Sequence, residues 1–533
     1  MTRRAAVTAL IAAGVLAGLM ETSFPSIIGW PVAAWDALHL VVGFVAAGLA
    51  LMAANRFWPL PWRQPAVAVA LACIGCVMAG LLGGVAWPNS ADEYSYVVQA
   101  DTFAAGRLWN AAPPDAALLE SYHLLVKDGR MVSPYPPAWS AYLVPFRAIG
   151  VLWLANPLLM AWLGTALIGA CRRLDPRPEV REPALALTLL TPFALFLGGS
   201  VFPHVMSCAL VASLVWAQLA DEARPRVWRK LLIGALFGAL LLTRYDVFAV
   251  VAVVYAIDRL VLRRAGAIAD GMVVVLGLLP FVVALGAYNA AIAGDPLQVT
   301  ATWGSAAEHH LDAGGAGGLT RAASQMLFWA GSLAQFGGLP VALLAMIALA
   351  VKLRRRTYRF YDLLFPGAVA LSALLPFSGG HQYGPRYWFW AWPLGTLTIV
   401  SAFGASCPRV AGRRFSLEGF ASANLVAALA SFGVLLVTTR AYVDARRAVF
   451  EGGQPDARAV VLLPTRTLRV WPWQIVGIAA DSRDFTRNGI DAGNRVLYGR
   501  ADLSDAQERA CRLDGRDVFR WVEPGRLVRV ACP

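Results

Sequence analysis

Two adjacent carboxylates, Asp92 and Glu93, follow an apolar segment that ends at Trp87. A positioned carboxylate can take a proton from a hydroxyl group or return one, so both residues are candidates for acid or base catalysis. Ser90 stands three residues before Glu93, which is the spacing of a helix capping box. Two interpretations of Glu93 therefore stay open, a helix cap and a catalytic group, whereas the cap does not need Asp92.

A helix is predicted over residues 91–105, with Gly106 ending it, because glycine commonly follows the last turn of a helix. Helical spacing places four of its side chains on one face: Asp92, Tyr96, Gln99 and Phe103. The carboxylate and the tyrosine of this face could together contact a hydroxyl group of a substrate.

Cationic and aromatic side chains in other segments could complete a binding site. A guanidinium can donate paired hydrogen bonds to a phosphate, so Arg244 and Arg386 are candidates to bind one. The alternatives are an ion pair with Asp246 for Arg244 and a position at the membrane interface for Arg386. The full set of substrate-binding or phosphate-binding candidates is Tyr96, His123, Tyr135, His204, Arg244, Tyr245, Asp246, His381, Tyr383, Arg386 and Tyr387.

Glu308, His309 and His310 are the residues considered as metal ligands. Together with the other histidines they could hold zinc, but the spacing matches no closed set of ligands. Hydrogen bonds to a substrate and solvated loop positions are the alternatives. We predict no metal site and no cofactor, with a divalent metal as the second option.

The composition indicates what surrounds the elements that carry these residues. Of the 533 residues, 58% are hydrophobic and 15% are charged, so the polar residues are too few to cover a soluble globule. A bilayer must therefore solvate most of the chain. The net charge of +13 does not indicate nucleic-acid binding, because the arginines lie in short clusters between apolar runs, where they set membrane orientation.

About thirteen apolar runs can cross the roughly 30 Å of hydrocarbon in a bilayer. They lie near residues 5–20, 36–54, 65–87, 151–170, 184–199, 203–220, 231–243, 246–262, 270–292, 339–353, 361–377, 387–405 and 420–438. The run 138–149 is shorter and is flanked by prolines, so we expect a re-entrant or interfacial helix there.

Arginine clusters occur in alternate loops, which predicts a cytoplasmic N-terminus. The loops 88–137, 294–324 and 378–386 and the tail after Arg440 then lie outside. The predicted orientation of the later loops requires that 231–243 and 246–262 are two separate spans. The basic residues that flank the pair favour two spans.

The last part of the chain, 439–533, is polar and predicts a small α/β domain outside the membrane. Its apolar runs fit strands at 459–463, 495–498, 518–522 and 527–531. A disulfide between Cys511 and Cys532 would stabilise so small a core by about 3 kcal/mol. The predicted division is two additional helices in 1–64, a transmembrane core in 65–438 with a large first external loop at 88–147, and this domain.

The order of several short motifs resembles the membrane glycosyltransferases of the GT-C class. Within the class the chain is similar to the bacterial branch related to protein O-mannosyltransferases and the lipid A aminoarabinose transferase. The motifs cover about residues 65–405 and include Asp92-Glu93, Tyr135-Pro136-Pro137, Leu242-Thr243-Arg244, Tyr288-Asn289 with Gly294-Asp295-Pro296, and Gly384-Pro385-Arg386-Tyr387. The chain departs from part of the class in its two extra N-terminal helices and in lacking a D-x-D motif, which argues against a metal-dependent mechanism.

The resemblance implies an inverting transfer of a sugar from a polyprenyl-phosphate donor to a lipid, glycan or protein acceptor, with Asp92 in the position of the catalytic residue. It implies a multi-pass monomer in the bacterial inner membrane with its site facing the periplasm. The alternatives are a transporter or flippase of lipid-linked saccharides and a scaffold for envelope assembly.

Overall fold

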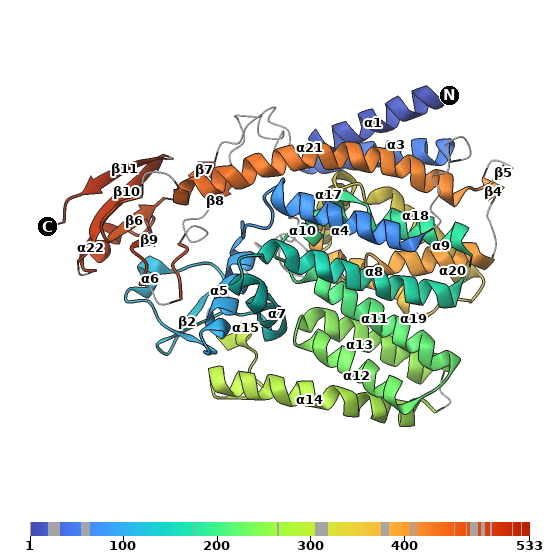
Figure 1. The fold of residues 1–533 in the computed structure, drawn as a ribbon, viewed down its shortest axis with the longest axis horizontal. Coiled ribbons are helices and arrows are strands. Elements are labelled where there is room, and N and C mark those ends of the chain that lie inside the picture. The colour runs from blue at the N-terminus through green and yellow to red at the C-terminus, as the bar shows by residue number, and fades with distance from the viewer. Residues whose placement is uncertain are drawn as a thin grey trace.

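In the computed structural model, the described part of the chain comprises residues 2–19, 32–54, 64–175, 177–263, 266–303, 318–374, 383–405, 409–410, 413–451, 454–464, 466–468, 478–480, 486–490, 493–513, 515–523 and 525–532. Most of it is helical. Figure 1 shows the helices lying side by side, with the C-terminal sheet at one end of the molecule and the short strands β4 (Arg409–Val410) and β5 (Arg413–Arg414) at the other.

Helices lie at each of the thirteen positions predicted from apolar runs. They are α1 (Arg3–Leu19), α3 (Val32–Ala53), α4 (Pro65–Leu81), α8 (Ala155–Leu174), α9 (Pro178–Leu189) with α10 (Pro192–Gly199), α11 (His204–Ala223), α12 (Val227–Leu241), α13 (Tyr245–Ile257) with the π-helix η2 (Asp258–Arg263), α14 (Ala267–Ala293), α18 (Leu339–Arg354), α19 (Phe360–Leu374), α20 (Leu394–Ala405) and α21 (Leu417–Glu451). The pair α12 and α13 are separate helices, as the sequence predicts.

Length and composition make the chain a multi-pass membrane protein. Among the described residues, four helices are long and apolar enough to cross a membrane, or up to six spans if each of two bent pairs is one span. The bent pairs are α9 with α10, at 58°, and Met326–Gln335 with α18, at 115°. The count of thirteen spans and their orientation stay predictions.

One long helix was not predicted. Helix α17 (Gly318–Gln335) begins inside the segment 294–324, for which the sequence predicts an external loop. The helix is strongly amphipathic and packs along α3. A search for uninterrupted apolar runs misses such a helix, because Thr320, Arg321, Ser324 and Gln325 interrupt its first half.

The segment between α4 and α8 forms a small body of mixed structure. It contains α5 (Ala91–Ala104), β1 (Asn110–Ala111), α6 (Ala116–Leu119), β2 (Leu125–Lys127), β3 (Arg130–Val132), α7 (Pro137–Ala148) and the 3-10 turn η1 (Leu152–Leu154). The three strands pair antiparallel in the order β1-β3-β2. Helix α5 ends before Gly106, whose φ of 71° suits glycine, and α7 occupies the position expected for the interfacial helix.

The C-terminal strands form where the sequence predicts them. They are β6 (Ala459–Leu463), β9 (Val496–Arg500), β10 (Asp517–Glu523) and β11 (Arg526–Val530), in the order β11-β10-β6-β9. Strand β6 is parallel to β9 and β10, and β11 is antiparallel to β10. A separate pair joins β7 (Arg466–Leu468) to β8 (Ile478–Ala480). The Cys511–Cys532 disulfide is present and joins α22 (Ala506–Cys511) to the chain after β11.

The C-terminal sheet shares its core with the segment between α4 and α8. Leu118 and Leu119 of α6 are 0% and 4% exposed, and they pack with Val460, Leu462 and Leu497 of the sheet. Figure 1 shows α5, α6 and β2 beside the sheet at the same end of the helices. The first loop and the tail therefore form one packed body.

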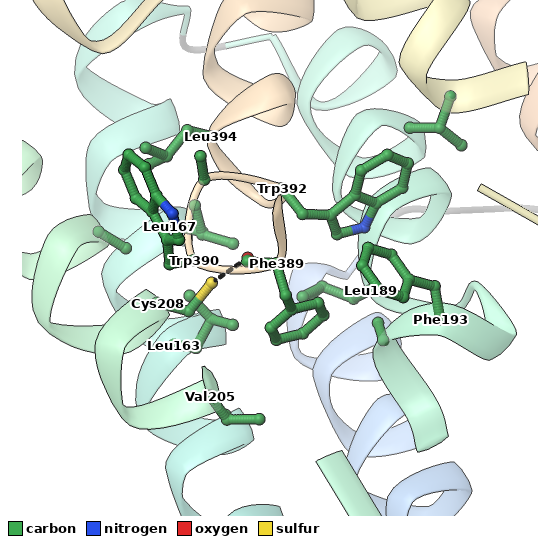
Figure 2. Packing of buried hydrophobic residues seen from close by; sticks show 14 of the residues in the cluster. Leu163, Leu167, Leu189, Phe193, Val205, Cys208, Phe389, Trp390, Trp392 and Leu394 are labelled. Atoms are coloured by element: carbon green, nitrogen blue, oxygen red, sulfur yellow. Dashed lines mark hydrogen bonds between the residues drawn. The ribbon is translucent and has the colours of Figure 1, made fainter. Parts of the chain in front are cut away.

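An aromatic run anchors the start of α20 in the helical core. Phe389 is fully buried and Trp392 is 2% exposed. Figure 2 shows Cys208 of α11 donating its thiol hydrogen to the backbone oxygen of Phe389, at 2.8 Å. The indole N–H of Trp392 donates to Thr188 O at 3.1 Å. These contacts fix the backbone that follows Arg386.

We expect Leu118→Ala to loosen the C-terminal sheet, although Leu118 lies more than 300 residues away from it in the sequence. Removing this buried side chain should destabilise the shared core by about 2–5 kcal/mol, because a cavity replaces it. Hydrogen–deuterium exchange in β6 and β9 would measure the effect. Val528→Ala, at a position 46% exposed on β11, should leave that exchange unchanged.

Candidate active site

The N-terminus of α5 carries the capping box that the sequence predicts. Ser90 Oγ accepts a hydrogen bond from Glu93 N at 3.3 Å. Glu93 Oε2 accepts from the backbone N–H groups of Asn89 and Ser90, each at 3.2 Å, and from the Ser90 hydroxyl at 3.1 Å. Glu93 is fully buried. Its carboxylate holds the turn that leads into the helix.

Glu93 also joins α5 to the loop between α10 and α11. Its Oε1 accepts from the backbone N–H of Val201 at 3.1 Å. The same loop is held from its other side, because the Trp139 indole donates to Val201 O at 2.9 Å and the Asn156 amide donates to Ser200 O at 2.7 Å. The entry to α5 is thus fixed against the helical core.

Asp92 contacts three candidate residues from three other segments. Arg386 Nη2 donates to Asp92 Oδ2 at 2.8 Å, the Tyr135 hydroxyl donates a short hydrogen bond to Oδ1, and His123 Nε2 lies 3.8 Å from Oδ1. Burial opposes the charged form of Asp92, but Arg386, His123 and Tyr135 together hold its pKa well below the usual range. The lowered pKa keeps Asp92 ionised, and 18% of its side chain remains exposed.

The predicted face of α5 is present. Tyr96 packs on Tyr135 with ring centroids 4.4 Å apart. The Gln99 amide donates to Tyr135 O at 3.1 Å and to the Tyr288 hydroxyl at 2.9 Å, and Phe103 meets Tyr288 edge to face. The face that carries Asp92 is therefore turned toward Tyr135 and the end of α14.

His123 is held in an unusual backbone conformation. Its φ is 56°, in the left-handed region that residues other than glycine rarely adopt. The Ser95 hydroxyl donates to His123 O at 2.6 Å, which fixes this turn against α5. Backbone strain of this kind concentrates at functional sites.

Arg244 lies just before α13 and joins the second half of the site. Its Nη1 lies 2.6 Å from His204 Nε2, and its Nη2 donates to Asp246 Oδ2 at 2.6 Å. Its guanidinium carbon is 5.4 Å from the ring centroid of Tyr387, which also lies beside Arg386. The ion pair with Asp246, one of the two alternatives, is thus present together with contacts to site residues.

Two buried N–H groups of the site have no acceptor among the described residues. They are Arg386 Nε and His204 Nδ1. A guanidinium has only donors, so His204 Nε2 must accept from Arg244, which puts the proton of a neutral ring on Nδ1. Arg386 and His204 are 8% and 2% exposed, and both lie against Phe202 and Tyr387. An oxygen-rich ligand would satisfy both donors.

The turn before Arg386 is tied directly to the entry of α5. The Asn89 amide donates a short hydrogen bond to the Tyr383 hydroxyl. Gly384 has a φ of 101°, and a Cβ there would lie 2.5 Å from the Phe193 ring, so only glycine fits. Tyr383, a predicted binding residue, therefore joins the entry of α5 to the turn that leads into Arg386.

The structure brings most of the predicted residues together. The connected cluster contains Asp92, Tyr96, His123, Tyr135, His204, Arg244, Asp246, Arg386 and Tyr387. Tyr245 packs in a neighbouring apolar cluster with Tyr288. His381 and the run Glu308, His309 and His310 lie outside the described residues.

Asn89 and Phe202 contact site residues and are not among the residues predicted from the sequence. Asn89 stands directly before the capping box, so its position was a usable signal. Phe202 gave none, because an apolar residue at a helix end has many uses.

No group of three or more histidine, cysteine, aspartate or glutamate side chains within the described ranges could hold a metal ion. The described cluster holds two carboxylates, each paired with a guanidinium: Asp92 with Arg386 and Asp246 with Arg244. That combination suits proton abstraction next to a phosphate.

The fold is similar to that of ArnT, an aminoarabinose transferase, from Cupriavidus metallidurans. Its apo structure matches with a TM-score of 0.52 at 13% identity, over 85% of this chain and 92% of that chain. The structure bound to undecaprenyl phosphate matches with a TM-score of 0.53 at 12% identity and the same coverage. The chain therefore has the GT-C fold that its motifs predict. No protein-family model matches the chain, and no curated protein matches it.

We expect Glu93 to make stability depend on pH between about 4.5 and 7. Burial raises its pKa from 4.5 to about 7, against the N–H donors that favour the charged form. Within this window the folded state holds more protons than the unfolded state, so the free energy of unfolding should fall with rising pH, by roughly 3 kcal/mol in total.

Thermal unfolding midpoints between pH 4.5 and 8 would measure this slope. Glu93→Gln should lower the midpoint and remove the contribution, because an amide neither titrates nor accepts all four hydrogen bonds. Glu508→Gln, on the exposed surface of α22, should keep the wild-type slope. An unchanged slope in Glu93→Gln would contradict the assignment.

Proposed function

We propose that the protein is an inverting GT-C glycosyltransferase, which moves a hexosyl or pentosyl group from a polyprenyl-phosphate donor to a hydroxyl group of a lipid, glycan or protein. The pairing of Asp92 with Arg386 supports this most directly, because an ionised carboxylate that could act as a base lies beside a guanidinium that could bind a phosphate. The proposed location is the bacterial inner membrane with the site facing the periplasm, which the arginine distribution favours.

Asp92 is the proposed base of the reaction. As the acceptor oxygen forms its bond to the anomeric carbon, its proton passes to the Asp92 carboxylate. The bond between that carbon and the phosphate oxygen breaks, and its electron pair stays on the phosphate. Glu93 takes no part, because its oxygens are occupied by the capping box and Val201.

Arg386 and Arg244 are the proposed phosphate-binding groups. Both guanidiniums lie beside Tyr387, and the N–H groups of Arg386 Nε and His204 Nδ1 lack acceptors among the described residues. Arg386 can bind a phosphate through Nε while its Nη2 stays on Asp92. The base then keeps its position when the donor is present.

We expect Asp92→Asn to lower the transfer rate by about 10²–10⁴-fold, because an amide cannot take the proton. The rate would be measured with purified protein, a panel of undecaprenyl-phosphate sugars, and lipid, glycan and peptide acceptors that carry hydroxyl groups, following the glycosylated acceptor and the release of undecaprenyl phosphate. Asp101→Asn is the matched control, since Asp101 lies on the same helix and pairs with Arg147 at its surface.

A wild-type rate in Asp92→Asn would exclude Asp92 as the base. Wild-type protein that moves the lipid-linked sugar across liposome membranes without transferring it would instead favour the transporter alternative.

We expect Arg386→Ala to weaken binding of undecaprenyl phosphate by about 10- to 150-fold, because a charged hydrogen bond contributes about 1.5–3 kcal/mol. Arg386→Lys should recover part of the affinity through its charge. Arg440→Ala removes a guanidinium that pairs with Asp444 on the surface of α21, and should bind as wild type does. Equal affinity of Arg386→Ala and wild type would refute the phosphate-binding role.

A further inference from the structure

Arg487 lies in a cage of aromatic rings at the entry to α5. Its guanidinium carbon is 4.5 Å from the ring centroid of Trp87, 5.3 Å from that of Tyr94 and 5.5 Å from that of Phe450. Its Nη1 donates a short hydrogen bond to the backbone oxygen of Pro88. The side chain therefore contacts the chain on both sides of the capping box.

The contacted segment leads directly to Asp92. Pro88 precedes Asn89, whose amide is bound to Tyr383, and Tyr94 follows Asp92 by two positions. The stretch from Pro88 to Tyr94 carries the carboxylate, so a shift at either end moves the carboxylate relative to Arg386.

The other side of Arg487 is fixed to the C-terminal sheet. The Asn488 amide donates to Tyr498 O at 2.8 Å, and the Tyr498 N–H donates to Asn488 Oδ1 at 2.7 Å, which joins the segment 486–490 to β9. Thr486 donates a short hydrogen bond to Glu120 O of the first loop. Arg487 thus presents its guanidinium from a well-anchored backbone.

An arginine suits this place for a physical reason. A planar guanidinium can stack on aromatic faces and donate a hydrogen bond from its edge at the same time. A lysine ammonium could also lie near the rings, but it lacks the planar fork.

We propose that Arg487 is a positioning residue for the transfer reaction. Through Pro88 and Tyr94 it fixes the entry of α5 against the C-terminal sheet and so holds Asp92 at Arg386. This proposal rests on the function proposed above, and it gives the last part of the chain a role in positioning Asp92.

The test compares Arg487→Ala and Arg487→Lys with wild type in two measurements. The transfer rate at saturating donor should fall at least about tenfold in Arg487→Ala, because a small displacement of a catalytic group is costly, while affinity for undecaprenyl phosphate stays within about twofold. Hydrogen–deuterium exchange at residues 89–94 should become faster. Arg487→Lys should show an intermediate rate and intermediate exchange.

Arg500→Ala is the matched control. It breaks the ion pair between Arg500 and Glu120, a second tie between the sheet and the first loop, without touching the residues next to Asp92. Its transfer rate and its exchange at residues 89–94 should match wild type. An equal loss of rate in Arg500→Ala would overturn the proposal, because general docking of the sheet would then explain both effects.

Wild-type rate and exchange in Arg487→Ala would also overturn the proposal. If Arg487→Ala does not fold, Arg487→Lys decides the question. A wild-type transfer rate and wild-type exchange at residues 89–94 in Arg487→Lys would overturn the proposal. Wild-type protein that transfers none of the sugars supplied would refute the proposed function alone, because exchange at residues 89–94 would still decide whether Arg487 holds the entry to α5.

Discussion

The site depends on the ion pair between Asp92 and Arg386, whose partners stand 294 residues apart. Taking both charges out of water is costly, so such a pair forms only where the surrounding structure fixes both side chains. On one side, the capping box and the Glu93–Val201 hydrogen bond fix the first turn of α5. On the other side, the turn that carries Arg386 is fixed by the buried aromatic run that follows it and by the hydrogen bond between Tyr383 and Asn89.

The pKa values of the neighbouring carboxyl groups of Asp92 and Glu93 shift in opposite directions. Successive side chains of a helix point about 100° apart, so the two groups meet different surroundings. Glu93 faces the core, where burial raises its pKa, and it meets uncharged N–H and O–H donors. Asp92 faces Arg386, His123 and Tyr135, and its charge is stabilised by them. The pair therefore divides into a residue that builds the helix entry and a residue that is available for chemistry.

The local features of this arrangement could be predicted from the sequence. The capping box, the end of α5 at Gly106, the four C-terminal strands and the Cys511–Cys532 disulfide each depend on residues close together in the chain. Contacts between distant segments could not be predicted. Nothing in the spacing shows which carboxylate Arg386 would meet, and helix α17 was missed because its polar face interrupts the apolar run.

The C-terminal sheet shows why the distant contacts matter most. A four-stranded sheet with one short helix has a small core, which a disulfide stabilises but does not enlarge. Leu118 and Leu119 from the first loop fill that core, so the sheet and the loop cannot be packed independently. The same loop begins with the capping box, so the helix entry that carries Asp92 and the C-terminal sheet belong to one packed body.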